Sequence, residues 1–150
     1  MKNLAERICE VLNGFEGRTC DFLPESLGMS VPAAGVFFQS GVKERRYLDG
    51  SVGLRIPFAV RMRIDGICGR DRLDIFASFM SLAEYLRGSS FVMEIDGGRI
   101  DGIFSKGVPT RVSVFADGCE EYMMAFEADV LWYSPFGVKE NEEEKDDGSV

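Results

Sequence analysis

Hydrophobic and polar side chains alternate with a period of two along the middle of the chain. The apolar positions of this stretch, residues 54–65, are Leu54, Ile56, Phe58, Val60, Met62 and Ile64. A period of two over this length is typical of a long strand with one face buried. Because Pro57 has no backbone N–H to donate to a ladder, we expect this strand to lie at a sheet edge or to carry a bulge.

Two other segments show the spacing of amphipathic helices. The first is at the start of the sequence, where one stripe is made by Leu4, Ile8, Val11, Leu12 and Phe15, and Gly14 and Gly17 are expected to end it. The second begins near Asp71 and ends near Arg87, with Gly88 placed as a C-terminal cap. The apolar residues of this second helix cover more than one stripe. We therefore expect one side to pack on a sheet and the rest to contact a second layer or a neighbouring subunit.

Shorter strands complete the pattern. Strands are predicted at residues 34–38, in the polar segment 41–49, and, after the second helix, at 91–95, 100–104, 111–116 and 121–133. The predicted order is α-β-β-β-α-β-β-β-β, with no internal repeat and no linker. This order indicates an α+β fold, a sandwich in which two helices pack on one side of an antiparallel sheet.

The composition of the sequence predicts a folded body followed by a tail. The 150 residues carry a net charge of −8, and residues 139–150 hold six acids and two lysines. That segment has too few apolar residues to bury, so we expect residues 1–135 to form a single domain and residues 136–150 a disordered acidic tail. The alternative is an acidic arm that docks on a basic partner.

The absence of histidine removes several classes of chemistry. Zinc triads and Ser–His or Cys–His pairs need an imidazole, and the chain has none. The four cysteines form no C-x-x-C pair, so Cys9, Cys20, Cys68 and Cys119 are interpreted as core thiols of a reducing compartment. We expect no metal, no cofactor, no signal peptide and no membrane span.

Acidic residues offer the remaining enzymatic candidates. Glu94, Asp96 and Asp101 flank a predicted turn, and Glu127 and Asp129 alternate along a strand. Such positions are typical of solvated acids, so a structural role is favoured over an acid–base pair or a cation site. The glycine-containing turn at residues 65–71 precedes a helix and could bind an anion, although any strand-to-helix turn would use the same residues.

The strongest local charge feature is basic. Residues 43–72 contain eight of the 17 basic residues against four acids. Three interpretations remain open: a solvated strand face that protects an edge, a contact with an acidic protein surface, and a contact with the DNA backbone, which the overall charge disfavours. The candidate interface residues are Arg45, Arg46, Tyr47, Arg55, Arg61 and Arg63.

Short sequence words in this region resemble a known family. The segment Arg46-Tyr47-Leu48-Asp49-Gly50-Ser51, the strand start Ile56-Pro57-Phe58-Ala59-Val60 and the helix start at Arg70-Asp71 are similar to tailed-phage tail-terminator or minor capsid proteins. The strand at residues 125–130 resembles the closing strand of that family. The resemblance covers residues 1–135 as an order of elements and residues 47–90 as words.

The resemblance implies a structural virion protein without catalysis or cofactor. Such proteins form a ring, commonly a homohexamer, that caps the tail tube, stops its polymerisation and presents a surface to the head–tail connector. The implied partners are further copies of the chain, the tube protein and the connector protein, with no membrane and with DNA only passing through the ring. The implied location is the head–tail junction of a virion assembled in the host cytoplasm. The hairpin at residues 41–63 would then contact a neighbouring subunit or the tube.

Two alternatives to the tail-terminator function remain open. One is another ring of the same particle, the connector stopper or the tube protein itself. The other, from a different class, is a small-ligand-binding or enzymatic α+β domain with a concave sheet pocket.

Overall fold

The computed structural model describes residues 2–18, 20–28, 31–65, 69–88 and 92–133. The tail predicted at residues 136–150 lies outside this range. In chain order the elements are α1 (Lys2–Asn13), β1 (Phe22–Pro24), β2 (Ala33–Phe38), β3 (Lys43–Arg46), β4 (Val52–Asp65), α2 (Gly69–Gly88), β5 (Met93–Ile95), β6 (Gly98–Ser105), β7 (Thr110–Val114) and β8 (Cys119–Trp132).

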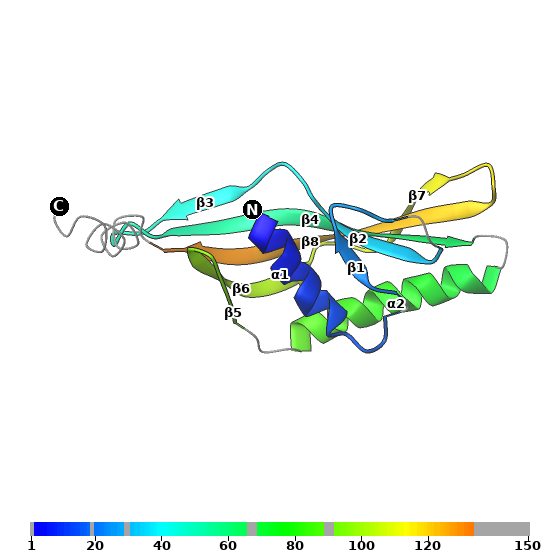
Figure 1. Cartoon of the computed structure of the whole chain (residues 1–150), viewed down its shortest axis with the longest axis horizontal. Helices are drawn as coiled ribbons and strands as arrows, with labels where there is room; N and C mark the ends of the chain where they lie inside the picture. Colours follow the sequence, from blue (N-terminus) through cyan, green and yellow to red (C-terminus); the bar gives the residue numbers. More distant parts are fainter. Residues whose placement is uncertain (1, 19, 29–30, 66–68, 89–91, 134–150) are drawn as a thin grey trace.

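One twisted sheet organises the molecule around its two long strands (Figure 1). The strand order is β1-β2-β4-β8-β6-β5, with β3 also paired to β4 and β7 also paired to β8. β4 and β8 run antiparallel along their whole length, from the pair Val52 and Trp132 to the pair Asp65 and Cys119. Only the pairing of β1 with β2 is parallel among the described strands. The predicted α+β class is confirmed, and the sheet departs from a fully antiparallel one at that edge.

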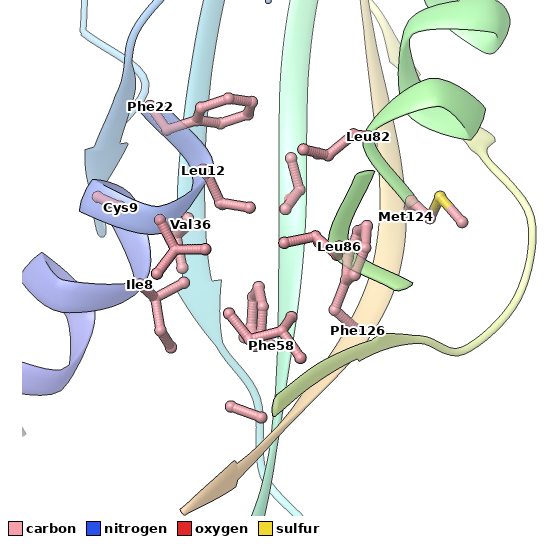
Figure 2. Close-up of a cluster of buried hydrophobic side chains, with 14 of the residues drawn as sticks. Ile8, Cys9, Leu12, Phe22, Val36, Phe58, Leu82, Leu86, Met124 and Phe126 are labelled. Atoms are coloured by element: carbon pink, nitrogen blue, oxygen red, sulfur yellow. The ribbon is translucent and has the colours of Figure 1, made fainter. Parts of the chain in front are cut away.

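Both helices cover the same face of this sheet. Figure 2 shows Ile8 and Leu12 of α1 and Leu82 and Leu86 of α2 converging on Phe58 and Phe126 of the central strands. The alternation predicted for residues 54–65 is confirmed, since Ile56, Phe58, Val60, Met62 and Ile64 are all buried on this face. No helix of the described residues lies on the other face of the sheet, which we call the open face.

Pro57 lies in a central strand, so its predicted place at an edge is wrong. The strand beside β4 is interrupted, because β2 ends at the pair Phe38 and Phe58 and β3 begins at the pair Lys43 and Arg55. The Pro57 carbonyl accepts a hydrogen bond from the Gln39 amide at 3.0 Å on that side. A residue of an antiparallel strand directs its nitrogen and its carbonyl to the same neighbour. The missing N–H therefore faces Gln39, just past the end of β2, and only one of the two bonds of that pair forms, so the proline lies where the neighbouring strand is interrupted.

The two halves of the sheet share one local design, although no repeat was expected from the sequence. The β3–β4 hairpin turns at Asp49-Gly50 and the β7–β8 hairpin turns at Asp117-Gly118, with Gly50 at φ 89° and Gly118 at φ 91°. In each turn the aspartate accepts a hydrogen bond from the amide two residues later, at 2.9 Å and 3.0 Å. In each half, a long central strand lies beside two shorter strands in line. β2 and β3 pair with β4, and β6 and β7 pair with β8.

The structure has four strands before α2 where the sequence predicted three. The missed strand, β1, has only three residues, and only Phe22 among them is buried. Its position is set by Asn13 at the end of α1, whose side chain accepts a hydrogen bond from the Phe22 amide at 2.7 Å and donates one to the Phe22 carbonyl at 3.2 Å. A contact across a loop, rather than a local pattern, therefore defines this strand.

Candidate interaction surfaces

The basic residues before β4 form a projecting hairpin at one end of the sheet (Figure 1). We call β3, the turn at residues 47–51 and the start of β4 up to Arg55 the basic arm. All four residues of β3 are exposed, and Leu48 at the tip is fully exposed. The turn is held by Asp49, which accepts hydrogen bonds from the amide and the hydroxyl of Ser51. These bonds stabilise the carboxylate and lower the pKa of Asp49.

Strand register decides which arm side chains share a face. Lys43 is paired with Arg55 and Arg45 with Gly53, which places Lys43, Arg45 and Arg55 on the open face. The Tyr47 ring covers Gly53, where an added Cβ would meet ring atoms at 3.2 Å. Arg46 points to the opposite side, within 3.1 Å of Glu44. The arm therefore gathers Arg45, Tyr47 and Arg55 but separates Arg46 from them.

A hollow of about 340 Å³ lies at this end of the open face. Its lining combines the arm with the facing strands and is made by Lys43, Glu44, Arg45, Tyr47, Gly53, Leu54, Arg55, Asp101, Asp129, Val130 and Leu131. Arg55 spans part of it, with its Nε 2.9 Å from Asp129 Oδ1, and this contact raises the pKa of Arg55. Within the described part of the chain, Lys43 and Arg45 have no carboxylate partner. Two of the three basic side chains that line the hollow therefore have no ion-pair partner among the described residues.

Further along β4, arginines are held by the chain itself. Arg61 lies 2.8 Å from Glu121, a carboxylate whose side chain is only 6% exposed, and its guanidinium stacks over Phe37 at 5.2 Å. Arg63 lies over the Phe115 ring at 5.8 Å. Of the predicted interface residues, Arg61 and Arg63 are therefore already engaged inside the molecule, while Arg45, Arg46 and Tyr47 are exposed on the arm. Whether these six residues form an interface stays a prediction.

The other end of the sheet carries an apolar surface that the sequence interpretation missed. We call the exposed residues Val108, Val112, Val114 and Phe115 the apolar hairpin, since they surround β7 and its turn. Figure 1 shows β7 at the end opposite to β3. A signal was present, because Val112 and Val114 make a strongly β-forming segment. The sequence does not reveal that, among the described strands, β7 pairs with β8 alone.

An exposed stripe on α2 adds to this surface. Leu73, Phe76 and Met80 lie outside the core, while Ile75, Phe79, Leu82 and Leu86 are buried. The Phe76 ring meets Tyr122 of β8 edge-on, with ring centroids 5.7 Å apart, so the stripe lies beside the β7–β8 end of the sheet. The prediction that α2 presents more than one apolar side is confirmed.

The acidic candidates are engaged in structural contacts. Glu94 accepts a hydrogen bond from the Tyr133 hydroxyl at 2.8 Å, Asp101 pairs with Arg99 at 2.7 Å, and Glu127 lies 3.7 Å from Lys106. Across the described ranges no three histidine, cysteine or acidic residues gather as a metal site. Residues 66–68 of the turn at residues 65–71, a candidate for anion binding, lie outside these ranges, and Cys68 is among them. No described helix is both long and apolar enough to span a membrane.

The predicted core thiol at Cys9 is confirmed. Cys9 is buried between α1 and the sheet (Figure 2), and burial, together with nearby Glu6, raises the pKa of its thiol to about 12. A thiol held protonated in this way is a poor nucleophile at neutral pH. Cys20 and Cys119 are half-buried.

Comparison with known proteins gives a likeness of fold. No family model matches the sequence, and no curated protein matches it. Among solved structures, a chain from the virion of a native gene transfer agent particle is similar, with a TM-score of 0.50 and 16% sequence identity. The match covers 69% of this chain and 72% of that chain. At this identity, the likeness concerns the fold.

Proposed function

We propose that this chain is a structural protein of a phage-like virion, and that it acts as a tail terminator. In this role a ring of copies, commonly a hexamer, caps the tail tube, stops its polymerisation and presents a surface to the head–tail connector. The chain would have no catalytic activity and no cofactor. The likeness to a chain of a gene transfer agent virion supports the coarser part of the proposal, a virion component.

The observation that carries the ring is the chemical difference between the two ends of the sheet. A closed ring of identical subunits in head-to-tail contact needs two different surfaces on every subunit, each of which fits the other. The basic arm at one end and the apolar hairpin at the other supply two different surfaces, and in the proposed ring each would contact a different part of a neighbouring subunit. The apolar stripe of α2 enlarges the second surface beyond what one hairpin offers.

The first test is the mass of the purified protein in solution. We expect size-exclusion chromatography with light scattering to show a discrete ring, formed either by the protein alone or after tube protein is added. The variant Arg45→Glu should weaken ring formation about tenfold or more, since reversing a charge at a contact introduces repulsion. Arg87→Glu, an exposed charge reversal at the end of α2, is the matched control and should leave the ring intact. A chain that stays monomeric and binds neither tube nor connector protein would refute the proposal.

A second test separates a terminator from another ring of the same particle, such as a stopper or the tube protein. Tails assembled without a terminator should grow beyond their normal length in electron micrographs. Tails of normal length that remain without heads would instead indicate a joining role. Long stacks formed by this protein alone would indicate a tube protein.

A further inference from the structure

The basic arm lies beside the point at which the described chain leaves the sheet. Arg46 is paired with Val52, and Val52 with Trp132, so these three residues are level with one another across β3, β4 and β8. Neighbouring strands lie about 4.8 Å apart, which puts β3 about 10 Å from the end of β8. The described end of β8 thus lies close to the arm.

The sequence that follows Tyr133 is acidic, whereas the arm is basic. Residues 140–147 contain Glu140, Glu142, Glu143, Glu144, Asp146 and Asp147, and six residues separate Tyr133 from the first of these acids. Six residues can span about 20 Å when extended, which is more than the distance to β3. On the arm, Lys43 and Arg45 have no carboxylate partner among the described residues, and both line the hollow on the open face.

The other basic residues near this end already have partners. Arg55 is held by Asp129, Arg46 lies against Glu44, and Arg99 is paired with Asp101. These pairs also engage the three carboxylates that line the hollow, so Lys43 and Arg45 are the charges of its lining that have no ion-pair partner among the described residues. Tyr47 and Leu131, which also line the hollow, would supply contact surface beside these two charges.

We propose that the acidic segment 140–147 docks on the basic arm of its own chain, at the hollow between β3 and β8, through Lys43 and Arg45. This contact accounts for the acidic residues near the end of the sequence, which the proposed terminator function leaves without a role. The inference concerns a contact within one chain and does not depend on ring formation.

Zero-length cross-linking of the full chain tests this contact. A carbodiimide joins a lysine amine to a carboxylate only when the two are in contact, and Lys43 is the only lysine of the arm. We expect mass spectrometry to find Lys43 joined to acids within residues 140–147, and 1 M NaCl, with a Debye length of about 3 Å, to abolish that product. The link between Lys106 and Glu127, whose charged atoms lie 3.7 Å apart in the sheet, is the internal control and should persist.

Acetylation of lysines gives a second measurement that does not need the cross-link. In a variant with Glu140, Glu142, Glu143 and Glu144 changed to Gln, and Asp146 and Asp147 changed to Asn, Lys43 should be acetylated about fivefold faster, as expected from the loss of exposed ion pairs. Lys106 should react at an unchanged rate. An unchanged rate at Lys43, or no cross-link to residues 140–147 at low salt, would overturn the proposal.

Isotope labelling decides whether the segment and the arm belong to one chain. Unlabelled and ¹⁵N-labelled protein are mixed unfolded, refolded together and cross-linked. Docking within one chain yields only fully light or fully heavy cross-linked peptides, whereas mixed peptides would overturn it in favour of contact between copies. A protein that remains monomeric, contrary to the proposed terminator function, still gives the light and heavy products if the docking is correct.

Discussion

The rings of Phe58 and Phe126 stack across the centre of the sheet, with centroids 5.6 Å apart and ring planes 16° from parallel. They are directly paired residues of β4 and β8, and neither is exposed to solvent. They also hold equivalent positions in the two halves, because the sequence offset between Asp49 and Asp117 is the same as that between Phe58 and Phe126. The two halves of the sheet therefore join through a matched aromatic pair.

Truncation of this pair should strongly destabilise the fold. We expect Phe126→Ala to lower the free energy of unfolding by about 3–5 kcal/mol, because the change leaves a cavity in the centre of the core. Urea unfolding followed by circular dichroism measures the loss. Phe104→Ala is the control, since that ring is 49% exposed on the neighbouring strand, and it should cost about 1 kcal/mol or less. Equal losses in the two variants would contradict a central role for the stack.

Breaking the ion pair between Arg61 and Glu121 should show how much stability is lost when a nearly buried carboxylate has no partner. We expect Arg61→Gln to destabilise the protein by about 1–3 kcal/mol, because the nearly buried Glu121 loses its partner. The double variant Arg61→Gln/Glu121→Gln should recover most of this loss, as no charge then remains unpaired. Arg99→Gln, whose partner Asp101 is 40% exposed, should change stability by about 0.5 kcal/mol or less. A double variant as unstable as the single one would show that packing, and not charge, is responsible.

Cys9 should resist alkylation and contribute to a loss of stability in alkali. The folded protein holds the thiol proton to a pKa of about 12, whereas the unfolded chain releases it near 9.0. Above pH 9 the unfolded state therefore binds fewer protons than the folded state, and the free energy of unfolding falls as the pH rises towards 12. Iodoacetamide at pH 8.5 followed by mass spectrometry should find Cys9 unmodified in the native protein and modified in urea. Cys9→Ala should make the alkaline fall shallower, and an unchanged slope would argue against this thiol.

The turn between β7 and β8 should require glycine at position 118. We expect Gly118→Ala to cost about 1–2 kcal/mol, because the residue has φ 91° and a Cβ is disfavoured there. Gly107→Ala is the matched control in the same part of the chain, where an added Cβ meets nothing within 4 Å. Thermal unfolding of the two variants measures the difference. Similar midpoints for both would mean that the turn tolerates a side chain.

Long periodic elements could be predicted from the sequence because their signals are local. The alternation around Phe58 and the helical stripe of α1 each repeat over several turns or pleats, and one buried face is enough to produce them. The Asp-Gly turns could also be identified, since a positive φ favours glycine. The β1 strand could not, because a side chain of α1 fixes it across a loop.

Only part of the candidate interface could be predicted from the sequence. The arginines of residues 43–63 stand out by composition, but their partners lie on β8, far along the sequence. Sequence could not separate Arg61, held by Glu121, from Arg45, which has no carboxylate partner among the described residues. The exposure of the apolar hairpin was hidden for a related reason, since Val112 and Val114 would look the same in a buried strand.

The sequence by itself determined the class of the fold, the long strand, the two helices, the basic hairpin and the lack of histidine chemistry. These properties follow from composition and from periods of two and 3.6 residues, which neighbouring positions specify alone. The tertiary structure decided the order of strands, the central place of Pro57, the stacking of Phe58 on Phe126, and the separation of a basic arm from an apolar hairpin at opposite ends. Each of these depends on pairing between distant segments, and such pairing is selected by the packing of the whole core rather than by any local stretch of residues.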